Sequence, residues 1–342
     1  MRRRAQKTNS AARRKKTHLS PAKCEKPHLC PSNAKIRTFF LQMRKGASVP
    51  RKRKAALCPA FGGLRAFFLD AHSKKEYNTV VMIIDTHAHL NYSDRYGDEA
   101  SLFQSLREAH ISKIINVGWN YDSSAYAAEQ AKRCDFLYFA AGFHPSNLDD
   151  FQPGDYEKLQ RLLAHPKGVA VGEIGLDYHY ADTDPARQKR AFVEQMELAH
   201  ALKLPFIVHS RDAAADTLAI FRQNKPILEY GAVMHCFSGS PETAAEYLKL
   251  GLYISFAGPV TFKNARRLDE VAKLVPSDRI LAETDCPYLA PEPLRGTQNT
   301  PKNVKYVYEK LALLRGESPA RLEEQIEKNA HTLFKKLGAA EK

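Results

Sequence analysis

From Met82 onward, short apolar runs alternate with longer amphipathic stretches, and this alternation restricts the possible folds more than any other feature. Strands that alternate with helices at this spacing indicate βα units and a parallel sheet. Eight units in 261 residues match the α/β class and its (β/α)8 barrel, the TIM barrel, which typically takes about 250 residues. The apolar runs are residues 82–84, 113–117, 137–141, 168–171, 205–208, 232–234, 252–256 and 279–282.

The stretches between these runs have the period of amphipathic helices. An open doubly wound sheet is the alternative, but no Gly-x-Gly-x-x-Gly motif follows the first run. The predicted helices are residues 99–109, 123–133, 155–164, 184–203, 212–223, 241–250 and 264–274.

The net charge of +14 is confined to one end of the chain. Residues 1–81 hold 21 of the 52 Lys and Arg residues and three of the 38 acidic residues, so residues 82–342 hold 31 basic and 35 acidic side chains. We expect residues 1–81 to be a disordered basic extension. It is interpreted as a transit peptide, as a nucleic-acid-binding arm, or as a segment upstream of a translation start at Met82. The segment also contains Cys24, Cys30, His18 and His28. It has no closely spaced CxxC pair of cysteines, which argues against a zinc site.

The six cysteines are widely spaced, unlike those of a small disulfide-linked protein, so we expect a reducing, cytoplasmic compartment. No window approaches 18 consecutive apolar residues, and no secretory apolar region follows the basic start. We therefore predict no membrane segment, and nothing in the sequence indicates an obligate protein partner.

Residues of the types that bind metals follow the predicted strands. In a barrel, the carboxyl ends of the strands surround one mouth, where such enzymes place their active sites. Any one of these residues has a structural interpretation as a cap or loop residue, but their coincidence favours a metal site. They are His87, His89, Glu173, His209, His235 and Asp285.

A single catalytic ion needs fewer than six protein ligands when one of its coordination positions stays open for water or substrate. We therefore infer two divalent cations, which are Zn²⁺, Mn²⁺ or Mg²⁺. We expect His87, His89 and Asp285 around one ion and His209 and His235 around the other. The two oxygens of Glu173 suit a bridge between the ions. Asp285 is also placed to accept a proton from the hydroxide-forming water, so Glu173 and Asp285 are the predicted catalytic residues.

The chain from Met82 to about residue 338 resembles the TatD family of metal-dependent deoxyribonucleases. The resemblance implies a two-metal hydrolase that cleaves phosphodiesters, typically as a 3′-to-5′ exonuclease on DNA and sometimes on RNA, and it assigns the metal roles to the six residues above. Cys286 replaces a common Ser, and the loop 295–301 lacks the extra basic residues and the acidic residue often found after its Arg-Gly pair. The matching segments are residues 84–90, 141–145, 172–178, 205–211, 235–239 and 283–289.

Two further residues are predicted to bind the substrate at the same mouth. His144 follows the third predicted strand, and Arg211 lies two residues beyond His209. A guanidinium fork matches phosphate oxygens, and a histidine can stabilise developing charge. One or two of the aromatic residues near the strand ends are expected to stack on bases. The candidates are Trp119, Phe143, Tyr178, Phe237 and Tyr288.

Three functions are compatible with these residues. The first is a nuclease in which a metal-bridging hydroxide attacks phosphorus. The second uses the same metals to hydrolyse an ester or amide, such as a misacylated tRNA. The third is a nucleic-acid-binding protein whose basic arm acts while the barrel is inert, and the complete ligand set argues against it.

Overall fold

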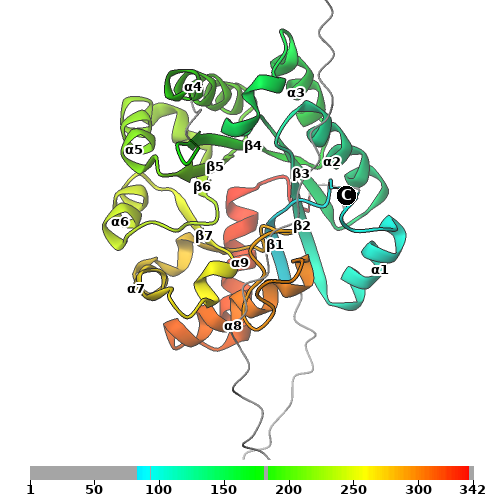
Figure 1. Cartoon of the computed structure of the whole chain (residues 1–342), viewed down its shortest axis with the longest axis vertical. Coiled ribbons are helices and arrows are strands. Elements are labelled where there is room, and N and C mark those ends of the chain that lie inside the picture. The colour runs from blue at the N-terminus through cyan, green and yellow to red at the C-terminus, as the bar shows by residue number, and fades with distance from the viewer. Residues whose placement is uncertain (1–82, 93, 181–183, 339–342) are drawn as a thin grey trace, which may run out of the picture. The chain divides into compact units, whose positions relative to one another are not determined.

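A computed structural model describes residues 83–92, 94–180 and 184–338. The predictions for residues 1–81 and for Met82 lie outside this part. Eight strands pair in sequence order, each parallel to the next, and helices surround them (Figure 1). This confirms the predicted (β/α)8 barrel. The strands are β1 (Ile83–Ala88), β2 (Ile111–Val117), β3 (Leu137–Ala141), β4 (Gly168–Asp177), β5 (Phe206–Arg211), β6 (Ala232–Met234), β7 (Tyr253–Phe256) and β8 (Ile280–Ala282).

Helices follow the first seven strands as the amphipathic pattern predicts, and two further helices, which were not predicted, follow the last strand. Side-chain caps begin several of them; for example, Asn120 and Ser123 form a capping box before α2. None of the described helices is long and apolar enough to cross a membrane. The helices are α1 (Glu99–Glu108), α2 (Tyr121–Arg133), α3 (Asp155–Leu163), α4 (Pro185–Ala201), α5 (Ala214–Gln223), α6 (Pro241–Lys249), α7 (Arg266–Leu274), α8 (Val304–Arg315) and α9 (Pro319–Leu333).

Backbone hydrogen bonds join β1 to the segment that follows β8. The amide of Asp285 donates to the carbonyl of His87 at 2.9 Å, and the amide of His89 donates to the carbonyl of Cys286 at 2.8 Å. These contacts tie the first and last strands together at their carboxyl ends. Hydrogen bonds of the backbone therefore fix His87, His89 and Asp285 where the end of β1 meets the segment after β8. We call this junction the β1–β8 seam.

Two strands are longer than the sequence predicts. Glu173 and His209 were expected to end the fourth and fifth strands, but β4 continues to Asp177 and β5 to Arg211. The two extensions pair in register, Gly175 with His209 and Asp177 with Arg211. In the sequence, a polar side chain inside a strand looks like the end of that strand. Only the pairing of β4 with β5 shows that both strands continue.

Candidate metal centre

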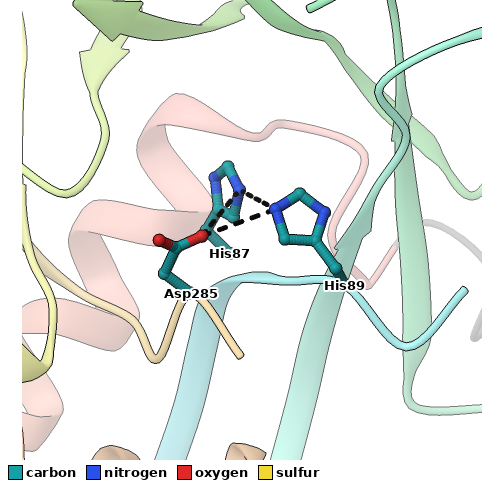
Figure 2. Close-up of side chains that lie close together, drawn as sticks. All are labelled: His87, His89 and Asp285. Carbon is teal, nitrogen blue, oxygen red and sulfur yellow. Dashed lines mark hydrogen bonds and ion pairs between the residues drawn. The ribbon is translucent and has the colours of Figure 1, made fainter. Parts of the chain in front are cut away.

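His87, His89 and Asp285 form a compact group at the mouth of the barrel (Figure 2). His87 lies near the end of β1 and His89 follows it, so the two imidazoles reach the same side, as alternation along extended backbone predicts. Their Nε2 atoms are 3.2 Å apart. Asp285 Oδ1 lies 3.4 Å from Nε2 of His89 and 3.7 Å from Nε2 of His87. Three donor atoms thus converge on one point.

The carboxylate of Glu173, in β4, separates this group from a second one. Its Oε2 lies 3.4 Å from Nε2 of His87, while its Oε1 lies 2.8 Å from Nε2 of His235 and 2.9 Å from Nδ1 of His209. His209 comes from β5, and His235 directly follows β6. The two oxygens of one carboxylate therefore face different sets of histidines.

Asp177 and His144 extend the second group outward. His209 Nε2 lies 3.1 Å from Asp177 Oδ2, and His144 Nε2 lies 3.6 Å from Oε1 of Glu173. Asp177 was quoted in the sequence motif but given no role. Its position offered a signal, because in a strand residues four apart point to the same face, and Asp177 is four residues after Glu173.

Two buried carboxylates lie behind the histidines. Glu283 Oε1 accepts a hydrogen bond from the amide of Cys236 at 2.6 Å and lies 3.3 Å from Nδ1 of His235. Asp85 accepts hydrogen bonds from Thr284 at the β1–β8 seam, and burial raises its pKa to about 8 against the effect of these bonds. Sequence reasoning assigned neither residue a role.

The charges of the centre compensate one another. Burial opposes ionisation of Glu173, but His235 and His144 hold its pKa well below the usual range. Burial also opposes protonation of His209, yet Asp177 and Glu173 raise its pKa. His144 differs, because burial and the neighbouring His209 lower its pKa to about 3.

The donor set fits divalent metal ions of the borderline class. Imidazole nitrogens and carboxylate oxygens suit Zn²⁺ and Mn²⁺, and carboxylates suit Mg²⁺. Within the described residues, three groups have donor atoms that all lie within 4.8 Å of one another. They are His87 with His89 and Asp285, His87 with Glu173 and His235, and His144 with Asp177 and His209.

A cleft of about 780 Å³ opens over these groups, and both predicted substrate residues line it. His144 accepts a hydrogen bond at Nδ1 from the amide of Ser146, which leaves Nε2 toward the centre. Arg211 is exposed at the end of β5, and its guanidinium lies 5.8 Å from the ring centroid of Tyr180. The neighbouring Asp212 lies 3.2 Å from Nδ1 of His179.

The five aromatic candidates separate by location. Trp119 and Tyr288 line the cleft. Phe143 and Phe237 are buried in the core, and the hydroxyl of Tyr178 donates to Asp216 at 2.8 Å. Tyr92, which sequence reasoning missed, lines the cleft beside Trp119.

An eight-stranded parallel barrel with histidines and carboxylates gathered at its carboxyl-end mouth defines the metal-dependent hydrolases of the TIM-barrel class. Comparison with known proteins narrows this class. The family model described as TatD related DNase matches residues 84–335, so the chain belongs to the TatD family of metal-dependent hydrolases.

Individual relatives agree with this assignment. The chain is 41% identical over 254 residues to the Bacillus subtilis protein named uncharacterized metal-dependent hydrolase YabD, covering 74% of this chain and 99% of YabD. It is 35% identical over 246 residues to the 3′-5′ ssDNA/RNA exonuclease TatD of Cronobacter sakazakii, covering 70% and 92%. The crystal structure of YJJV, a TatD homologue from Escherichia coli, superposes with a TM-score of 0.71 at 32% identity and covers 75% and 99%.

Proposed function

We propose that the protein cleaves phosphodiester bonds of DNA, as a 3′-to-5′ exonuclease that also accepts RNA, with two divalent cations as Mg²⁺, Mn²⁺ or Zn²⁺. The observation that carries the proposal is the position of the Glu173 carboxylate, whose Oε2 faces His87 and whose Oε1 faces His209 and His235. The nuclease named among the relatives supports the choice of substrate.

In this proposal each group of residues holds one cation. His87, His89 and Asp285 would hold the first and His209 and His235 would hold the second, while Glu173, whose oxygens face both sets, would contribute to each. Bound divalent cations would supply an activated water at neutral pH and balance charge on the phosphate. Because these residues come from β1, β4 and β5 and from the segments that follow β1, β6 and β8, the barrel itself sets the spacing between the two sets of residues.

The protein's own side chains accept the proton from the attacking water and bind the phosphate. Although burial opposes its ionisation, His89 and the neighbouring histidines keep the pKa of Asp285 below its usual value, so Asp285 is ionised and able to accept a proton from the attacking water. Arg211 binds phosphate oxygens from the exposed side of the cleft. His144 is neutral at pH 7 and can hydrogen-bond to the phosphate through Nε2.

Cleavage of end-labelled single-stranded DNA tests the proposal. The full chain is loaded separately with Mg²⁺, Mn²⁺ and Zn²⁺ and incubated with strands labelled at the 5′ end, so that shortening from the 3′ end gives a ladder. Glu173→Gln and Asp285→Asn are expected to abolish cleavage while the circular dichroism spectrum is unchanged. Glu157→Gln, an exposed acid on α3, is the control and retains activity.

The same experiment separates phosphorus from carbonyl substrates. A model ester and a misacylated tRNA are included because activated water attacks either centre. Hydrolysis of these substrates without cleavage of any strand would overturn the proposal, as would wild-type turnover by either metal-site variant.

We also propose that the protein acts in the cytoplasm. The three cysteines of the described residues, Cys134, Cys236 and Cys286, are free thiols, as expected in a reducing compartment. Fractionation of cells with an antibody against the barrel tests this location.

A further inference from the structure

Three aromatic side chains, Tyr92, Trp119 and Tyr288, form a cluster at one side of the cleft; we call them the aromatic cluster. The rings of Tyr92 and Trp119 stack with centroids 4.3 Å apart at 19°. Tyr288 meets Tyr92 edge-on at 6.0 Å, and their hydroxyls are hydrogen-bonded at 2.9 Å. The three residues follow β1, β2 and β8, so the folded barrel brings them together from distant parts of the sequence.

The aromatic cluster borders the metal centre directly. The ring of Trp119 lies 5.6 Å from that of His89, and the ring of Tyr92 lies 6.3 Å from it. Tyr288 is three residues beyond Asp285, and its amide donates to the carbonyl of Asp285 at 3.1 Å. All three aromatic residues line the same cleft as His89 and Asp285.

This side of the cleft exposes apolar surface. Tyr288 is 45% exposed and the adjacent Leu289 is 40% exposed. Within the part of the chain that the structure describes, only five large hydrophobic side chains are exposed, and three of them, Tyr180, Tyr288 and Leu289, line this cleft. Exposed apolar side chains that gather in a concavity mark a binding surface.

We propose that the aromatic cluster is a stacking site for a nucleobase, whose own phosphate lies at the metal centre beside His89 and Asp285. The inference rests on the proposed function, because it specifies the substrate of the same cleft. Aromatic rings stack on the flat face of any base, which binds a strand without selecting a sequence. The guanidinium of Arg95 lies 5.9 Å from the ring centroid of Tyr92 and places a positive charge beside the base, where the strand continues.

The stacking site also determines which strands can enter. A base inside a duplex is already stacked and paired, so it must leave the helix before it can reach Tyr288. This requirement is consistent with the single-stranded substrate in the name of the Cronobacter sakazakii relative.

The fluorescence of Trp119 reports on this site, because the chain contains one tryptophan. The metal-loaded full chain is titrated with a four-nucleotide deoxyadenylate strand that has cleavage-resistant phosphorothioate linkages, and with an abasic strand of the same length and linkages. Binding of both strands is followed in parallel by anisotropy of a label on the strand. The base-carrying strand is expected to quench Trp119 and to bind more tightly than the abasic strand.

Variants at Tyr288 separate stacking from packing. Tyr288→Ala is expected to weaken binding of the base-carrying strand about tenfold and to leave the abasic strand unaffected. Tyr288→Phe keeps the ring and loses only the bond to the Tyr92 hydroxyl, so it retains the affinity. Leu313→Ala removes an exposed apolar side chain of α8 outside the cleft and serves as the control.

The outcomes distinguish this inference from the proposed function. Equal affinities and equal fluorescence changes for the two strands, or an unchanged affinity in Tyr288→Ala, would overturn the stacking site. If the metal-loaded enzyme still cleaves DNA in that case, the proposed function stands alone. Absence of both binding and cleavage contradicts the proposed function and the stacking site with it.

Discussion

The carboxylate of Asp85 accepts two hydrogen bonds from Thr284, one from the backbone amide at 2.9 Å and one from the hydroxyl at 2.6 Å. Asp85 is in β1, and Thr284 follows β8. The pair therefore joins the first strand to the last, directly below the metal centre. The amide of His87 also donates to Asp85 at 3.2 Å, so the same carboxylate fixes the backbone on both sides of the seam.

We expect Asp85→Asn to lower the free energy of unfolding by about 1–3 kcal/mol, the usual cost of leaving a buried polar group without its partner. Above its pKa of about 8, Asp85 accepts at both oxygens, whereas an amide has only one acceptor oxygen and cannot satisfy both donors of Thr284, so the two proteins are compared at pH 9. Urea denaturation measures the change. Thr284→Val, which removes the hydroxyl and keeps the amide, is expected to cost less. Equal stability of wild type and Asp85→Asn would show that the pair does not close the seam.

Gly175 permits the close approach of β4 to β5 at the site. Its φ is +140°, and a Cβ placed there would lie 2.0 Å from the carbonyl oxygen of His209. Gly175→Ala must therefore push His209 away from Glu173 or strain the backbone. We expect at least tenfold weaker metal binding and a loss of stability of about 1–3 kcal/mol. Metal titration and thermal denaturation measure the two effects. As control, Gly251→Ala also has positive φ but no neighbour within 4 Å, so it should lose stability alone.

The sequence predicted the barrel because each βα unit carries its own pattern, with an apolar run for the buried strand and a periodic face for the helix. The convergence of His87, Glu173 and Asp285 was also predictable, since all strand ends of a barrel meet at one mouth. Asp177 was missed because a polar residue that ends an apolar run looks like the first residue of a loop. The contact of Tyr92 with Trp119 depends on how two loops fold over the mouth, and no local pattern encodes it.

Glu283 is expected to act on the metal centre through His235. Its Oε1 lies 3.3 Å from Nδ1 of His235, and its Oε2 accepts a hydrogen bond from the hydroxyl of Ser255 at 2.5 Å. Removing a carboxylate that orients a metal-binding histidine typically costs about 10–100-fold in metal affinity or activity. We therefore expect Glu283→Gln to weaken metal binding by about this factor, measured by competition with a chelating indicator.

Ser255→Ala provides the matched comparison for Glu283. It removes one hydrogen bond to the same carboxylate and keeps the negative charge, so its effect on metal affinity should be smaller. A variant Glu283→Gln with wild-type affinity would mean that Cys236 and the barrel backbone alone orient His235.

Removal of bound metal is expected to lower the thermal stability without unfolding the barrel at room temperature. A ligand at 100 times its Kd stabilises the folded state by about 2.7 kcal/mol. For a domain of this size, each kcal/mol shifts Tm by roughly 2–4 °C, so EDTA should lower Tm by about 5–10 °C. The eight strands stay paired in the metal-free protein because their apolar core, which includes Ile114, Phe139 and Leu281, is buried independently of the site.

Differential scanning calorimetry with and without EDTA measures the shift, and added Zn²⁺ or Mn²⁺ should reverse it. Glu173→Gln should show a smaller shift because the amide keeps only one of the two oxygens that face the two groups, whereas a full shift in this variant would place the stabilising metal elsewhere.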